Sequence, residues 1–317
     1  MKTIGRYFVP KVVSRWLLLS VYLLLAGKSQ AQYLIPDQDP SFPLYSQVDT
    51  NELKKYEAAF DFETFNLKLV QQLRKTLQPA LAQQDPLAEW FYAKSMDLYP
   101  YGQGNAKDAA IALTYYTKAA DKGLARAEYF LYKLYRYGLM DVPVDEKKAL
   151  SYLQRAIHHG HTEGKAQCYL AMATLFGENE PNSLFQPNRD STLVYLEKAL
   201  ALTPNDTWAL DYAGGLYEEK GDYEKAIVYR LRSDNEQSHI QVAEWLMEGK
   251  YVKKDVDRSL QILYKTVDKL MKDYGKDLDG YMGGSNPLHV LNNWYRCKQW
   301  ITREQLGKYY DSNWICD

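Results

Sequence analysis

The densest group of residues that could do chemistry is a run of three histidines, His158, His159 and His161, interrupted by Gly160. Histidine is the commonest metal ligand and a frequent acid–base catalyst. Two of these histidines are adjacent at the end of a predicted helix and cannot share one helix face, and no fourth ligand follows at a suitable spacing. The C-terminus of a helix favours positive charge, which accounts for the run. We therefore predict no metal site.

The other patterns with catalytic potential are equally weak. The glycine pairs Gly102-Gln103-Gly104 and Gly283-Gly284 lack the strand-to-helix context that a phosphate-binding loop requires. Serine, histidine and aspartate residues occur without the elbow motif that marks a nucleophile. The acidic pair Glu218-Glu219 falls on a predicted solvent-facing helix surface. The sequence predicts a protein that is not an enzyme and needs no cofactor.

The elements that would position these residues repeat along the chain. The helix opening Ala88-Glu89-Trp90 recurs as Ala127-Glu128-Tyr129 and as Ala166-Gln167-Cys168, at steps of 39 residues. A second helical signature follows each opening. It occurs at Ala112–Ala120, Ala149–Ala156, Thr192–Ala199, Ala226–Ser233 and Ser259–Thr266. Two helical patterns in a unit of about forty residues are typical of an α-solenoid.

Small residues and tyrosines recur at fixed places in these units. We expect the small residues of the first helix of each unit, helix A, to let it approach the second, helix B; they are Ala93, Ala171, Gly214 and Ala243. We expect the tyrosines of helix B to fill the seam between neighbouring repeats, at about 2 kcal/mol for each buried ring. These tyrosines are Tyr115, Tyr152, Tyr195 and Tyr229.

The first residues have the pattern of an export signal. Four basic residues up to Arg15 precede the apolar run Trp16–Ala26, and Ser29-Gln30-Ala31 supplies the small residues of a cleavage site. We predict cleavage after Ala31 and a periplasmic or secreted protein, with an uncleaved membrane anchor as the alternative. Removing residues 1–31 changes the formal net charge from −1 to −6. An acidic chain is a poor partner for nucleic acid, and we predict no membrane insertion after cleavage.

The three cysteines have different predicted roles. Cys297 and Cys316 could form a disulfide in an oxidising compartment, which would contribute about 3 kcal/mol in the chain-entropy model. Cys168 takes the place of Trp90 and Tyr129 in its repeat, so we expect a small buried hydrophobic residue. The alternative is that all three cysteines are free.

The predicted domain order is a signal peptide at 1–31, a lead-in with a capping helix at 32–85, repeats at 86–270 and a helical cap at 271–317. The capping helix is expected to end around Pro79. Asp85-Pro86 opens the repeats as an N-cap followed by proline at the first helical position. The long loop of the third repeat, Gly177–Asp190, is predicted to lie at the rim of a binding face.

The chain resembles the Sel1-like repeat family, a branch close to the tetratricopeptide repeat, over residues 86 to about 270. Repeat one carries the family pattern in Tyr115-Tyr116 and Lys118-Ala119-Ala120, whereas Tyr132 in repeat two departs from it by occupying a position that is usually small. Repeat four is more similar to a tetratricopeptide unit, through Gly214, Tyr217, Gly221-Asp222-Tyr223 and Ala226.

The resemblance implies an all-α, right-handed α-α superhelix of about five helical hairpins with capping helices at both ends. It also implies protein–protein scaffolding. Some members look like immunity proteins against injected toxic effectors, including phospholipases, and a few are linked to penicillin binding. We therefore expect an exported, non-enzymatic scaffold that binds another protein or an extended peptide. An immunity protein is the alternative, and a penicillin-interacting or hydrolytic enzyme is the second alternative.

In such arrays helix A lines the concave surface, so its side chains between the packing positions are predicted to face a partner. The candidates are Phe91, Lys94, Phe130, Lys133, Arg136, Asp211 and Glu244. Aromatic and arginine anchors are common hot spots of protein interfaces. For Phe91 and Phe130 the alternative is that they pack on the neighbouring repeat.

Overall fold

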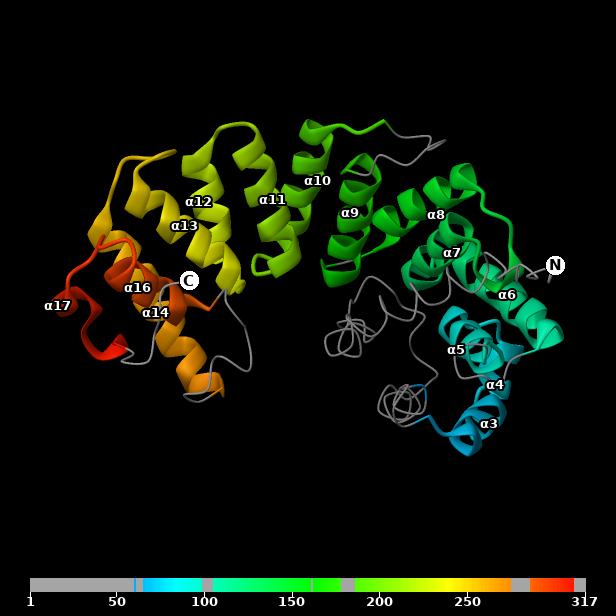
Figure 1. Ribbon diagram of the computed structural model, residues 1–317. Helices are drawn as coiled ribbons and strands as arrows, with labels where there is room; N and C mark the ends of the chain where they lie inside the picture. Colours follow the sequence, from blue (N-terminus) through cyan, green and yellow to red (C-terminus); the bar gives the residue numbers. More distant parts are fainter. Residues whose placement is uncertain are drawn as a thin grey trace, which may run out of the picture. The chain divides into compact units, whose positions relative to one another are not determined.

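The structure is a computed structural model that describes residues 60, 65–98, 105–160, 162–177, 186–274 and 286–310. Within these ranges the regular elements are helices and no strand occurs (Figure 1). The predicted all-α class is therefore confirmed. The leader, the predicted lead-in before residue 60, the glycine pairs near residues 103 and 283, most of the loop after Gly177, and Cys316 lie outside the described residues.

The helices pair into hairpins that match the predicted repeats. The five hairpins of the described part are α5 (Pro86–Met96) with α6 (Ala106–Asp121), α7 (Ala125–Tyr137) with α8 (Glu146–His159), α9 (Thr162–Gly177) with α10 (Arg189–Leu202), α11 (Thr207–Glu219) with α12 (Tyr223–Arg232), and α13 (Glu236–Glu248) with α14 (Val256–Tyr274). They are flanked by α3 (Leu67–Thr76) and α4 (Gln78–Ala82), and by α16 (Pro287–Arg296) and α17 (Arg303–Leu306); short 3-10 turns cover Leu139–Asp141 and Gly307–Tyr309.

The chain divides into two compact units, and their boundary between Cys168 and Tyr169 falls inside α9. We refer to them as unit 1 and unit 2. In unit 1, one apolar core continues from α3 to α7, and α3 inserts Val70 and Leu73 into it beside α5. In unit 2, α16 packs Leu291 against α13 and α14. Helices at both ends thus cover apolar surface of the adjoining hairpin, as capping helices do.

Side-chain caps fix where the helices begin. Asp85 Oδ1 accepts the backbone N–H groups of Leu87 at 2.8 Å and Ala88 at 2.9 Å, so α5 begins as predicted. Thr302 and Gln305 form a reciprocal capping box at the start of α17. The end expected around Pro79 is wrong. Pro79 lies in the first turn of α4, where its missing N–H would have no partner in the helix.

The repeated tyrosines contact aromatic rings within their own hairpins. Each packs on an aromatic residue of helix A, edge to face for Tyr115 and stacked for the others. The pairs are Tyr92–Tyr115, Tyr135–Tyr152, Phe176–Tyr195 and Tyr217–Tyr229, with ring centroids 4.7 to 5.8 Å apart. Aromatic pairs at such distances add about 1 kcal/mol beyond the area they bury. They therefore stabilise the hairpin as a unit.

The small residues of helix A have the predicted role. Ala93 and Ala243 are fully buried. A Cβ added at Gly214 would lie 2.8 Å from Cγ of Arg230, which shows how closely α12 approaches α11 there. Cys168 is buried and free, and burial raises the pKa of its thiol to about 12, so it is the predicted small hydrophobic residue.

Candidate functional site

A buried glutamate in the first turn of helix A joins it to the end of helix B. Glu89 accepts from Nζ of Lys122 at 2.6 Å. Glu128, which stands 39 residues later, accepts from Nε of Arg155 and Nδ1 of His159, each at 2.9 Å. The Glu128 side chain is fully buried, so these contacts hold the hairpin together.

The histidine run is thereby accounted for by structure. His159 is bonded to Glu128, and its ring packs edge to face on His158 with centroids 5.0 Å apart. His161 lies outside the described residues. Among the residues that the structure describes, no group of three or more histidine, cysteine or acidic side chains is placed to hold a metal ion.

The two phenylalanines proposed as partner contacts pack inside unit 1. Phe91 is only 1% exposed and belongs to the core. Phe130 contacts the rings of Trp90 at 5.8 Å and Tyr116 at 4.2 Å, both in the preceding hairpin. The alternative of packing on the neighbouring repeat therefore describes Phe130, whereas Phe91 is buried in the core of unit 1.

Arg136 also has an internal role. It is 7% exposed, and its Nη1 donates to Oε1 of Glu146 at 2.9 Å across the turn between α7 and α8. A buried arginine that already has a carboxylate partner offers little to a second one, because breaking such a pair costs about 3 kcal/mol or more. Arg136, which we predicted to contact a partner, thus stabilises the second hairpin.

One of the two candidates in unit 2 joins neighbouring helices. Asp211 of α11 accepts from Asn235 and from Ser238 at the start of α13, each at 2.6 Å. Glu244 of α13 is half-buried; burial raises the pKa of its carboxyl, and Lys298 partly opposes that rise.

Lys94 is one of the two cationic candidates that remain. Its ammonium lies 4.8 Å from the ring centroid of Phe60. It also acts on Asp97, one turn further along the chain. Burial raises the pKa of the Asp97 carboxyl to about 6, and the charge of Lys94 limits that rise.

Lys133 forms a stripe on α7 with two tyrosines. Tyr129, Lys133 and Tyr137 are spaced by four residues and so share one helix face; we call them the α7 stripe. Nζ of Lys133 lies 5.2 Å from the ring centroid of Tyr129, and Tyr137 is 50% exposed. Burial lowers the pKa of Lys133. Within the described residues no carboxylate pairs with it.

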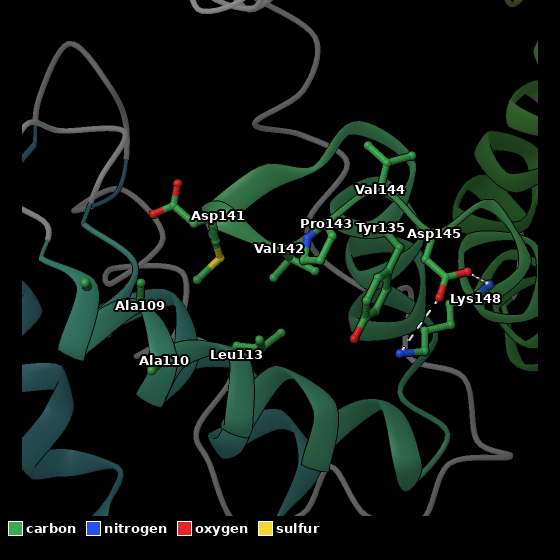
Figure 2. A pocket seen from close by; sticks show the side chains of 12 residues that line it. Ala109, Ala110, Leu113, Tyr135, Asp141, Val142, Pro143, Val144, Asp145 and Lys148 are labelled. Atoms are coloured by element: carbon green, nitrogen blue, oxygen red, sulfur yellow. Dashed lines mark hydrogen bonds and ion pairs between the residues drawn. The ribbon is translucent and has the colours of Figure 1, made fainter. Parts of the chain in front are cut away.

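A hollow of about 530 Å³ opens between α6 and the connection from α7 to α8. Figure 2 shows Leu113 and Tyr135 facing it from two helices, with Pro143 and Val144 on the connection. Its lining includes no serine, cysteine or histidine. The hollow is lined mainly by apolar side chains, and its charged lining residues are Asp141, Asp145 and Lys148.

Sequence reasoning missed this hollow because it depends on backbone geometry. Met140 and Asp141 follow Gly138 with φ values of 55° and 58°, a conformation that non-glycine residues rarely adopt. They turn the connection back toward α6. The signal in the sequence was limited to Gly138 and Pro143, which predict a turn but not its direction.

Comparison with protein families finds Sel1 repeats at residues 86–124, 125–161 and 237–268. These matches coincide with α5–α6, α7–α8 and most of α13–α14. Comparison with curated proteins gives no match. None of the described helices is long and apolar enough to span a membrane.

Two solved structures are similar to the chain. The crystal structure of a Sel1 repeat protein from Oxalobacter formigenes is 20% identical, with a TM-score of 0.49, and the match covers 85% of this chain and 100% of the other. That of c5321, a protective antigen of uropathogenic Escherichia coli with an SLR fold, is 15% identical, with a TM-score of 0.45, and the match covers 81% of this chain and 62% of the other. Three family matches fall in register with observed helical hairpins, so the chain contains Sel1 repeats at these residues.

Proposed function

We propose that the chain is a non-enzymatic scaffold that binds another protein through the exposed side of helix A in unit 1. Sel1-repeat proteins bind other proteins and are generally not enzymes. The observation that carries the assignment to this surface is the α7 stripe. It places a half-exposed tyrosine and a lysine without a carboxylate partner on one helix face. Tyrosines that keep a polar end in water are enriched at protein interfaces.

Site-specific photocrosslinking tests the location. Benzoylphenylalanine is placed at Tyr137, which is 50% exposed, and in a matched variant at Tyr251 of unit 2, which is 42% exposed. In the producing cells we expect a discrete protein adduct from position 137 and none from position 251. Equal adducts at both positions, or an adduct at 251 alone, would refute this surface.

We propose further that the chain acts outside the cytoplasm. Support comes from the basic leader, the apolar run Trp16–Ala26 and the small residues ending at Ala31. N-terminal sequencing of the exported protein should begin at Gln32. Retention of Met1 would contradict cleavage.

The finer proposal is that the bound partner is a toxic effector, which the chain neutralises as an immunity protein. It rests on the combination of an export signal with this type of repeat. Its test is growth of cells that receive the crosslinked partner in their periplasm, with and without the chain. Equal growth in both would leave the scaffold proposal standing and remove the immunity role.

A further inference from the structure

Three cations of unit 1 are each neutralised by a carboxylate of their own hairpin. The pairs are Lys122–Glu89, Arg136–Glu146 and Arg155–Glu128, with nitrogen–oxygen distances of 2.6 to 2.9 Å. Lys133 is different. Among the described residues its ammonium contacts the ring of Tyr129 and no carboxylate.

The repeat register shows how this counter-ion was lost. Lys94 and Lys133 stand 39 residues apart, at the same position of helix A in repeats one and two. Three residues after Lys94 comes Asp97, which is close enough for the two charges to interact. Three residues after Lys133 comes Arg136, whose charge is opposite and is satisfied by Glu146. Repeat two therefore keeps the lysine and replaces the acid.

The tyrosines of the α7 stripe do not supply the missing negative charge. Burial raises the pKa of Tyr129, and Cys168 and Tyr137 raise it further, so its hydroxyl stays neutral. The ring face of Tyr129 attracts the ammonium as a cation–π partner, a contact of about 1 kcal/mol. That is less than a hydrogen bond between two charged groups contributes. Lys133 as a residue is partly exposed, and its amine is surrounded by enough protein for burial to lower its pKa.

We propose that Lys133 receives the carboxylate of an aspartate or glutamate side chain of the bound protein, and that apolar neighbours of this acid lie on Tyr129 and Tyr137. The inference rests on the proposed function and specifies its ligand. A single cation beside an aromatic ring fits one carboxylate flanked by apolar side chains. It does not fit a polyanion, which needs several cations in a row. The carboxylate would compensate for the hydration that the ammonium loses where it lies against the helix surface.

Selection of peptides on the full chain tests this directly. A library of random dodecapeptides displayed on phage is enriched on the wild-type protein, and the recovered peptides are synthesised with amidated C-termini. Their affinities are measured by fluorescence anisotropy for the wild type, Lys133→Met, Lys133→Arg and Lys118→Met. Lys118 is the matched control, because its ammonium lies 4.6 Å from the ring centroid of Tyr115 on α6.

We expect enriched peptides with a shared acidic residue, and about a ten- to hundredfold weaker binding to Lys133→Met, as for the loss of a charged hydrogen bond. Lys133→Arg should retain most of the affinity and Lys118→Met all of it. Exchanging the peptide glutamate for glutamine should weaken binding to the wild type but not to Lys133→Met.

Two outcomes overturn the inference. Peptides that crosslink at position 137 but bind Lys133→Met as well as the wild type would refute carboxylate recognition and leave the proposed function intact. Peptides that bind only with a free C-terminus would refute the assignment to a side chain. Failure to enrich any peptide, together with no adduct at position 137, would remove the proposed function itself.

Discussion

Asp97 provides a quantitative test of the packing at the end of α5. Its carboxyl is half-buried, and its Oδ1 is buried without a hydrogen-bond partner. Burial raises its pKa from 3.8 to about 6, and the charge of Lys94 partly opposes the rise. The ionised form therefore destabilises the folded state at neutral pH. Replacing it by the neutral amide in Asp97→Asn should stabilise unit 1.

The magnitude and its pH dependence follow from the same shift. A rise from 3.8 to about 6 corresponds to at most about 3 kcal/mol at pH 7, and the solvent contact that Asp97 retains makes the real value smaller. The folded state binds the proton more tightly, so wild-type stability falls as the pH rises from about 4 to about 6. The advantage of Asp97→Asn should be full above pH 6 and absent below pH 4.

Hydrogen exchange of the α5 amides measures this locally, since a repeat protein need not unfold as one unit. Exchange of Ala88 to Met96 should be slower in Asp97→Asn than in the wild type at pH 7, after correction for intrinsic rates, and equal at pH 4. Asp222→Asn is the control and should destabilise the folded state at pH 7. The Lys225 side chain and backbone N–H lower the pKa of the Asp222 carboxyl, so its ionised form is the stabilising one. An advantage of Asp97→Asn that persisted at pH 4 would refute the electrostatic cause.

The remaining predictions concern the hairpin joints and the cysteines. Glu128→Gln, which removes the buried carboxylate that accepts from Arg155 and His159, should destabilise the second hairpin by about 2 kcal/mol in a urea titration followed by exchange of the α8 amides; a change below about 0.5 kcal/mol would contradict the role of this residue. Cys168 should resist iodoacetamide at pH 8 in the folded protein, because burial raises its pKa to about 12, and should react in urea; labelling under native conditions would show that α9 opens. Cys297 and Cys316 are predicted to form a disulfide in the exported protein, which a peptide pair linking them in a non-reducing digest would establish, whereas carbamidomethylated peptides would exclude it.

The hairpins and their caps could be predicted from the sequence because their causes are local. Asp85 followed by Pro86 begins a helix through contacts within four residues, and Gly214 allows a close approach through its own lack of a side chain. The ring partners of the repeated tyrosines could not be predicted. Periodicity shows that Tyr152 is apolar-facing but not that it stacks on Tyr135 of the same hairpin.

The partner-binding candidates were harder for a related reason. We predicted Arg136 as a partner contact because its own helix places no acidic residue on the same face. That prediction assumed that the arginine has no carboxylate partner elsewhere in the chain. Its acid, Glu146, comes from the far side of the turn between α7 and α8, and only the folded path of that turn brings the two together. The same turn creates the apolar hollow, through backbone angles at Met140 that no residue type in the sequence specifies.

Repetition itself separates structural positions from functional ones in this chain. Glu89 and Glu128 occupy one repeat position, and both pair with a cation near the end of their own helix B. A role that is kept from repeat to repeat is required by the hairpin and carries no information about a partner. Lys133 keeps the residue type of Lys94 but has lost the neighbouring acid, so the stability of its hairpin does not explain it. Positions at which the repeats agree in residue type and disagree in pairing are therefore where partner contacts should be sought first in a solenoid of this kind.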